Sequence, residues 1–209
     1  SDATWNTDSV NARSQLERNL EFDGSTSMAS ASAEISKEMN FGTDEFSLSG
    51  WFRHPSTAVS STQYVVSKYK EAGYGVYMNT SGYLCFGIDD DSIWNPDDVA
   101  CSTTSYADSK WHHFEAVRDS TSLTLYVDGN AVASDTTLSA TGSLNNTANF
   151  VLGADGDKSN FFSGFLDEIV IYPYARSADQ VKADILGSQT SAVFGSQTPD
   201  PLSEGLVGY

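Results

Sequence analysis

Short runs in which apolar and polar residues alternate dominate the chain, and turn residues separate each run from the next. In "FSLSGWF" (46–52), Phe46, Leu48 and Phe52 share one face, whereas Trp51 points the other way. Comparable runs occur at 19–24, 62–69, 74–79, 82–89, 111–119, 122–133, 149–155 and 164–172. Because a period of two turns one face of each strand toward a core, the pattern predicts many short antiparallel strands packed in two layers.

Two turns and two short helices complete this prediction. Asp128-Gly129 separates two alternating runs and favours a type I′ hairpin, and Gly82 favours a second hairpin within 78–84. The segment 176–186 predicts a helix, because Ser177 and Gln180 have the spacing of a capping box. A weaker helical pattern covers 32–40.

The expected fold is therefore an all-β, two-layer antiparallel β-sandwich (a jelly roll) with one or two short helices. The domain extends over 1–187. Residues 188–203 are rich in Ser, Thr, Gln and Pro and are typical of a linker. Residues 204–209, "EGLVGY", indicate a further strand, which opens a following module or completes a sheet.

The charge of the chain excludes two classes of partner. With 11 Lys and Arg against 28 Asp and Glu, the formal net charge is −17. Such a surface repels phosphate backbones and anionic lipid heads, so we expect neither nucleic-acid binding nor membrane-surface binding. No apolar run is long enough to insert in a membrane. Most of the acids are expected to serve solubility, although some would suit a hard cation such as calcium.

The two cysteines, Cys85 and Cys101, lie in segments that both read as strands, joined by a polar loop. Antiparallel pairing of these strands would bring the cysteines into disulfide range. The alternative is a pair of buried free thiols in a cytosolic protein. We favour the disulfide, because abundant Ser, Thr, Asn and Gly also indicate a secreted or cell-surface protein.

Four separated motifs occur in the order of a known family: "NLEFDGSTSM" (19–28), "FSLSGWFR" (46–53), "DSKWHHFEAVRDSTSLTLYVDGNAVA" (108–133) and "NFVLGADGDKSNFFSGFLDEIVIYPYARSADQVKAD" (149–184). The combination resembles the laminin-G-like modules of the concanavalin A-like lectin/glucanase superfamily. The resemblance implies a concanavalin A-like jelly roll. It also implies that a strand such as Gly205 to Tyr209 belongs at the start of a module. This strand would then open the next module of a tandem array, or it would complete a sheet by pairing within the chain or with a neighbouring molecule.

The sequence does not favour catalysis. The glucanase branch of this superfamily has Glu-x-Asp-x-Glu on one strand, and that spacing is absent here. Asp167 and Glu168 are consecutive, so a regular strand would turn them to opposite faces. Of the neighbouring His112 and His113, we expect one to pack in the core and the other to face water. We therefore expect no enzyme activity.

The resemblance implies a structural calcium ion between the turn after the entry strand and the start of the closing strand. Carried over to this sequence, its ligands would be Asp23, Gly24 and Asp167, with Asp167 pointing inward. The alternative is that Asp167 caps backbone N–H groups of the turn near Asp23 without a metal. The loop "GADGDKSN" (153–160) is a second, weaker calcium candidate, through its two aspartates and Asn160.

A ligand site is expected where aromatic and planar polar side chains share a loop. The loop after residue 88 combines Asp90, Trp94 and Asn95, and Asn160 adds a polar group beside two phenylalanines. The alternative is that Trp94 packs over its own hairpin and that one of the two phenylalanines enters the core. These features predict a non-catalytic binding module for glycans or for cell-surface or matrix proteins, with a role in adhesion. The competing hypothesis is a structural module of a surface fibre or layer, without a small-molecule ligand.

Overall fold

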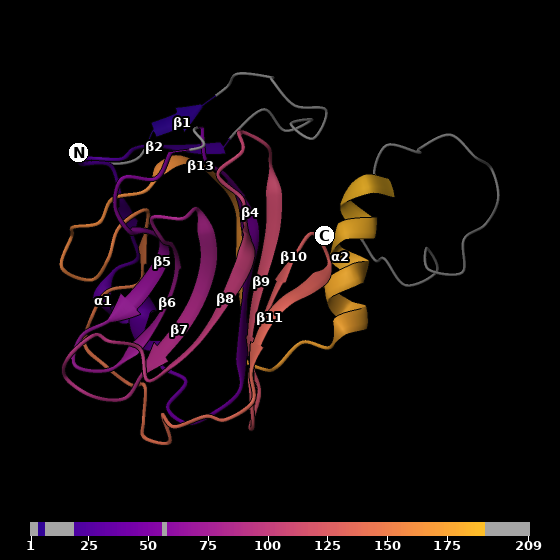
Figure 1. Cartoon of the computed structure of the whole chain (residues 1–209). Helices are drawn as coiled ribbons and strands as arrows, with labels where there is room; N and C mark the ends of the chain where they lie inside the picture. Colours follow the sequence, from indigo (N-terminus) through magenta and orange to yellow (C-terminus); the bar gives the residue numbers. More distant parts are fainter. Residues whose placement is uncertain (1–3, 7–18, 56–57, 191–209) are drawn as a thin grey trace, which may run out of the picture.

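The structure of the protein, a computed structural model, describes residues 4–6, 19–55 and 58–190. Two antiparallel sheets face each other (Figure 1). The first has seven strands in the order β1 (Thr4–Asn6), β2 (Asn19–Asp23), β13 (Ser163–Tyr172), β4 (Phe46–Arg53), β9 (His112–Arg118), β10 (Leu123–Val127) and β11 (Asn130–Asp135). The second has six, in the order β3 (Ala29–Ser30), β12 (Val151–Leu152), β5 (Gln63–Tyr69), β6 (Gly73–Met78), β7 (Tyr83–Asp89) and β8 (Asp98–Ser105). The predicted two-layer sandwich is confirmed.

The core lies between the sheets and follows the predicted alternation. Phe46, Leu48 and Phe52 of β4 are fully buried, and the ring of Phe46 contacts those of Tyr74 and Phe86 in the second sheet. Trp51 of β4 lies on the outer face, where its ring contacts that of His113 edge-on. The interior therefore comes from one face of each strand, as the period of two requires.

Two helices flank the sandwich. The helix α1 (Ala33–Lys37) begins after Ser32, and α2 (Ala178–Thr190) lies beside β10 and β11 (Figure 1). The predicted capping box is confirmed, because Ser177 N donates to Gln180 Oε1 (2.9 Å) and Gln180 N donates to Ser177 Oγ (3.3 Å). Neither helix of the described residues is long and apolar enough to cross a membrane.

The helix α2 is longer than the sequence analysis expected. Residues 188–190, predicted as the start of a linker, are helical and end the last turn of α2. The rest of the predicted linker and the predicted strand at 204–209 lie outside the described residues.

A buried ionic cluster holds α2 against the first sheet. Arg176 Nε lies 2.9 Å from Glu115 Oε1, and Arg176 Nη2 lies 2.8 Å from Asp184 Oδ2. The Nε–H does not point along the first of these lines, so the contact is an ion pair rather than a hydrogen bond. Burial raises the pKa of Glu115 to about 7, although the charge of Arg176 opposes this.

The motif at 108–133 is held together by the imidazole of His112, which lies between two carboxylates. His112 Nδ1 lies 2.8 Å from Asp128 Oδ2, and His112 Nε2 lies 3.1 Å from Asp108 Oδ1. Asp128 and Gly129 both have positive φ, which confirms the predicted type I′ turn. The expectation that one histidine faces water is wrong, because both are buried: the packing of Trp51 against His113 covers the outer ring.

Candidate ligand-binding site

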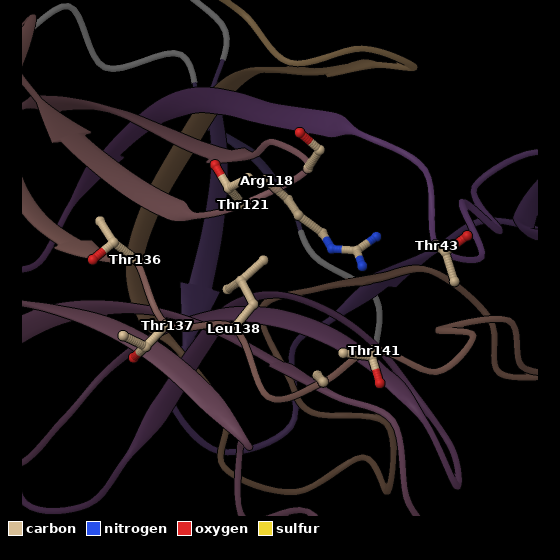
Figure 2. A pocket seen from close by; sticks show the side chains of 9 residues that line it. Thr43, Arg118, Thr121, Thr136, Thr137, Leu138 and Thr141 are labelled. Atoms are coloured by element: carbon tan, nitrogen blue, oxygen red, sulfur yellow. The ribbon is translucent and has the colours of Figure 1, made fainter.

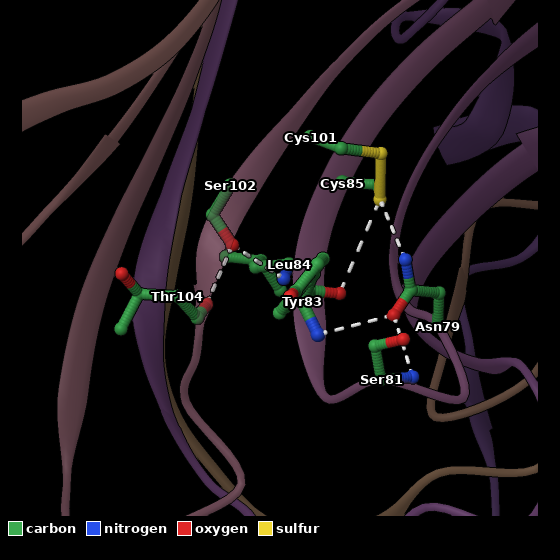
Figure 3. Close-up of a disulfide and its surroundings, with 8 residues drawn as sticks. All are labelled: Asn79, Ser81, Tyr83, Leu84, Cys85, Cys101, Ser102 and Thr104. Carbon is green, nitrogen blue, oxygen red and sulfur yellow. Dashed lines mark hydrogen bonds between the residues drawn. A yellow bond between two sulfur atoms is a disulfide. The ribbon is translucent and has the colours of Figure 1, made fainter.

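A disulfide closes the base of the loop that carries Trp94. Cys85 on β7 pairs directly with Cys101 on β8, with a Cα–Cα distance of 4.0 Å, and the bond is made (Figure 3). The predicted disulfide is therefore confirmed. The two strands continue from this crosslink into the connecting loop 90–97, so the crosslink restricts the loop from its base.

Asp89, at the end of β7, organises this loop from below. Its side chain is 1% exposed and accepts hydrogen bonds from the backbone N–H groups of Asp91 and Asn95, both at 3.0 Å. Burial raises the pKa of Asp89, and the two hydrogen bonds oppose the rise. This carboxylate therefore fixes the loop conformation that presents Trp94.

A second loop, 155–160, approaches Trp94 from β12. Asp155 accepts from Ser159 N (2.7 Å), Ser159 Oγ (2.7 Å) and Asn160 Nδ2 (2.6 Å), so both of its oxygens are used within the loop. Lys158 and Asn160 have positive φ, which tightens the turn. Tyr64 N donates to Asn160 O at 3.0 Å and ties the loop to the start of β5.

The two loops and β5 enclose a cavity of about 240 Å³. We call it the aromatic pocket, and its lining residues are Tyr64, Tyr69, Trp94, Asp155, Asp157, Ser159 and Asn160. The ring of Trp94 stands edge-on to that of Tyr69, with centroids 4.5 Å apart at 67°, and to that of Tyr64, at 6.2 Å and 60°. The rings are inclined to one another, so they form walls of the cavity instead of one flat stack.

Both pocket tyrosines stay neutral near pH 7. Burial raises the pKa of Tyr64, and burial together with Asp89 and other carboxylates raises that of Tyr69 to about 12. Tyr69 donates to the carbonyl oxygen of Asp91 at 3.2 Å, which fixes its ring against the loop. The arrangement offers apolar ring faces, neutral hydroxyls and carboxylates to a small ligand.

The structure brings together two of the four predicted ligand residues. Trp94 and Asn160 line the aromatic pocket, from loops far apart in the sequence. Asp90 does not, because its Oδ2 accepts from Gly142 N at 2.5 Å on another loop. Asn95 is exposed outside the lining, and its N–H serves Asp89.

Tyr64 and Tyr69 were not among the site residues predicted from the sequence. They stand at the two ends of one strand, and only the pairing of that strand with the loop 155–160 turns them into walls of a cavity. Asp155 and Asp157 were noted only as weak calcium candidates. The mixture of acids and Asn160 in "GADGDKSN" was the available signal for these two.

The three residues predicted to share a calcium ion do not meet. Asp23 pairs with Ser163 on β13, whereas Asp167 lies four residues further along that strand, opposite Trp51. At about 3.3 Å per residue, Asp167 lies roughly 13 Å along the strand from the position opposite Asp23. This is too far for both side chains to bind one ion with ligands at about 2.5 Å. Asp167 also shares the outer face with Trp51, so the expected inward direction is wrong.

The alternative prediction, that Asp167 caps the turn near Asp23, is also wrong, because Asp23 itself caps this turn. Its Oδ1 accepts from the backbone N–H groups of Ser25, Thr26 and Ser27 at 2.8, 2.8 and 2.9 Å. These hydrogen bonds lower the pKa of Asp23 well below its usual range. Gly24 has φ +72° and donates its N–H to Phe162 O, which joins the turn to the segment before β13.

Asp167 and Glu168 stand at a β-bulge. The register with β4 shifts between Asp167 and Val170, and Glu168 has φ +48° with its N–H donated to Asp167 Oδ1. The acidic pair therefore marks an irregularity of the strand. Within the described residues no group of three or more His, Cys, Asp or Glu side chains is arranged to hold a metal ion.

A second and larger cavity lies between β9 and the segment after β11. It measures about 640 Å³, and we call it the threonine pocket; it is lined by Thr43, Arg118, Ser120, Thr121, Thr136, Thr137, Leu138, Ala140 and Thr141 (Figure 2). Arg118 extends from β9 into this space, and its Nη1 donates to the carbonyl oxygen of Asp44 at 2.8 Å. No aromatic ring lines the threonine pocket.

Comparisons with known proteins agree with this architecture. Residues 23–182 match a laminin G family described as the Concanavalin A-like lectin/glucanases superfamily. No curated protein matches the sequence.

Among solved structures, the binding domain of Paraclostridial Mosquitocidal Protein 1 superposes with a TM-score of 0.71 at 14% identity, over 90% of this chain and 46% of that one. The botulinum neurotoxin serotype C1 binding domain gives 0.62 at 9%, over 90% and 46%. The binding domain of botulinum neurotoxin DC in complex with SialylT gives 0.62 at 10%, over 90% and 45%. The chain spans about half the length of these structures, and identities this low show a shared fold.

Proposed function

Because the chain belongs to the Concanavalin A-like lectin/glucanases superfamily, we propose that it is a non-catalytic module that binds glycans through the aromatic pocket. The observation that carries this proposal is the meeting of Trp94, Tyr69 and Tyr64 around one small cavity with polar side chains at its rim. Sugars present both a C–H face and hydroxyls, and this cavity offers a partner for each.

The size of the cavity supports a ligand group of one or two sugar rings. Pockets for drug-sized molecules enclose about 300–1,000 Å³, whereas this one encloses about 240 Å³. Ring faces of tyrosine and tryptophan provide large contact areas at a low cost in conformational entropy. Ser159 and Asn160 supply hydroxyl and amide groups beside those faces.

The similar solved structures support binding as the general role. Two are binding domains of a mosquitocidal protein and of botulinum neurotoxin serotype C1, and a third was solved with SialylT. Because the likeness lies in the fold, we take from it a role in binding and no specific ligand.

We extend the proposal to the cellular context. A disulfide and a chain rich in Ser and Thr support a secreted or cell-surface protein, where a glycan-binding module would serve adhesion. Glycans or surface proteins are its proposed partners, and calcium remains a proposal for the loop 155–160. The competing structural role rests on the strand at 204–209, which lies outside the described residues.

The proposal is tested by measuring glycan binding of the wild type and of Trp94→Ala on a glycan array and then by calorimetry. We expect the variant to lose about five- to thirtyfold in affinity, since ring stacking is worth roughly 1–2 kcal/mol. Ile93→Ala is the matched control, because Ile93 is the adjacent residue, 74% exposed and outside the pocket lining.

Thermal unfolding of both variants establishes that they are folded. Equal affinity of the wild type and Trp94→Ala would remove the aromatic pocket from the proposal. An array without any ligand, repeated with added calcium, would contradict glycan binding itself.

A further inference from the structure

The aromatic pocket is acidic as well as aromatic. Asp155 and Asp157 line it, and neither Lys nor Arg does so among the described residues. Three more carboxylates, outside the lining, contribute to the raised pKa of the Tyr69 hydroxyl, namely those of Asp89, Asp91 and Asp97. The net charge of −17 adds a background of the same sign.

The rings add a second attraction for a positive charge. The face of an aromatic ring carries negative electrostatic potential and attracts a cation within about 6 Å of the ring centre. Trp94 with Tyr69 and Trp94 with Tyr64 place three such rings around one small volume. A cation held there meets ring faces and carboxylates together.

Two polar groups of the pocket are available to a ligand. Asp157 accepts no hydrogen bond within the described part of the chain, in contrast to Asp155, whose oxygens are occupied by Ser159 and Asn160. Tyr64 is 6% exposed, its ring lies edge-on to that of Trp94, and the indole acts on the pKa of its hydroxyl in the direction opposite to burial. The hydrogen of that hydroxyl finds no acceptor among the described residues, so it is free to donate to a ligand oxygen.

Lys158 is the one cation on the loop 155–160 that could neutralise the pocket. It belongs to the same loop, but its side chain is exposed and forms no ion pair in the described structure. Its backbone N–H donates to Asp155 O at 3.1 Å, which directs the turn. The carboxylate of Asp157 is therefore left without a basic partner.

We propose that the aromatic pocket selects amino sugars whose amine is free and protonated, and that it rejects sialylated and other anionic glycans. The ammonium group lies against the rings and Asp157, and the ring hydroxyls of the sugar meet Tyr64 and Ser159. This inference rests on the proposed glycan-binding function and names the ligand class within it. Acetylation of the amine removes the charge and therefore the preference.

The test compares four probes by calorimetry with the whole chain: the β-1,4-linked trisaccharide of glucosamine, its fully N-acetylated counterpart, a sialylated trisaccharide, and propylammonium chloride. We expect the free-amine trisaccharide to bind about tenfold more tightly than the acetylated one, and the sialylated sugar not to bind. Higher ionic strength weakens binding of the amine and leaves a neutral sugar unaffected.

Three charge variants locate the effect. Asp157→Asn keeps the shape of the side chain and is expected to reduce the preference for the free amine to about threefold or less. Lys158→Gln removes the competing cation of the loop 155–160 and is expected to strengthen amine binding about twofold. Asp179→Asn on α2 makes the same change in net charge beside the other sheet, and it leaves the preference intact.

The outcomes separate this inference from the proposed function. Equal or tighter binding of the acetylated or sialylated sugar, lost in Trp94→Ala, would overturn the amine preference and leave glycan binding standing. Propylammonium that binds as tightly as the trisaccharide would support the cation site and contradict the glycan. Amine binding that requires added calcium would overturn direct recognition by Asp157. No binding of any probe overturns both.

Discussion

The aromatic pocket and the threonine pocket show that volume and binding chemistry are separate properties. The threonine pocket is the larger, at about 640 Å³ against about 240 Å³. Its charged group, Arg118, already donates a hydrogen bond to the carbonyl oxygen of Asp44, and its other walls are hydroxyls and aliphatic side chains. The smaller pocket combines three rings with the uncommitted carboxylate of Asp157. Oriented groups that remain free, more than space, distinguish a candidate site.

The two pockets also differ in how their walls are held. The loop with Trp94 lies between two strands joined by the disulfide of Cys85 and Cys101 and is fixed by the buried Asp89. Thr121 and Thr137 line the other pocket from exposed turns, where the backbone N–H of each donates to the side chain of a neighbouring aspartate. A pre-organised wall loses less entropy on binding, which favours the aromatic pocket as the site.

Removal of the disulfide is expected to give the largest effect, because it changes both the stability of the fold and the loop that forms a wall of the aromatic pocket. The crosslink joins residues 16 apart, and closing a loop of that length stabilises a protein by about 3 kcal/mol. Cys85→Ala with Cys101→Ala should lower the free energy of unfolding by about that amount, measured by urea denaturation. Ligand binding at Trp94 should weaken as well, because the base of its loop is released.

The control for this prediction is the reductant. Dithiothreitol should lower the stability of the wild type toward that of the double variant and leave the double variant unchanged. Equal stability of both proteins without reductant would show that the crosslink contributes nothing to the stability of the fold, and equal ligand affinity would show that it contributes nothing to the aromatic pocket.

Arg118→Met should separate stability from binding. Arg118 is buried and donates to Asp44 O, so its loss is expected to cost about 1–3 kcal/mol of unfolding free energy. Affinity at the aromatic pocket should not change. Thr141→Val, an exposed change in the same pocket, is the matched control and should stay within about 0.5 kcal/mol of the wild type. Loss of ligand binding in Arg118→Met at full stability would transfer the site to the threonine pocket.

The smallest expected effects are two opposite titration shifts, read from carboxyl carbon chemical shifts by NMR. Burial raises the pKa of Asp89 under the aromatic pocket. Burial also acts on Asp119 beside the threonine pocket, but hydrogen bonds from Ser122 and Thr121 outweigh it and lower that pKa. Shifts of the same sign for both carboxyls would contradict the contrast between the two environments.

The signs of the stability effects follow from these directions. Since the folded pKa of Asp89 is raised, its contribution is fully present below the unfolded value of about 3.9 and is lost as the pH rises through the folded pKa. For Asp119 the folded pKa is lowered, so its contribution is present above about 3.9 and is lost as the pH falls through the folded pKa.

Local sequence patterns predicted most of the fold. The alternation of Phe46, Leu48 and Phe52 identified the buried face of β4, and Ser177 with Gln180 identified the start of α2. These signals are readable because strand pleating and helix capping depend on neighbours within a few residues. The same patterns did not reveal the covering of His113 by Trp51, because that contact joins two strands.

The candidate site was predictable only in part. Trp94 and Asn160 stood out as an aromatic and a polar residue in loops, and both line the aromatic pocket. The proposed partnership of Asp23 with Asp167 failed, because the register of β13 places Asp167 beyond the reach of the turn. Register is a property of paired strands, and a single strand does not encode it.

The sequence by itself determined which residues face a core, where the chain turns, and that the surface is strongly acidic, since each depends on local pattern or composition. Only the tertiary structure decided that Tyr69 at the end of β5, Trp94 on the loop after β7 and Asp157 on the loop after β12 surround one cavity. The physical reason is that strand pairing and sheet packing bring together loops that are distant in the chain, and no local preference of those loops specifies their meeting.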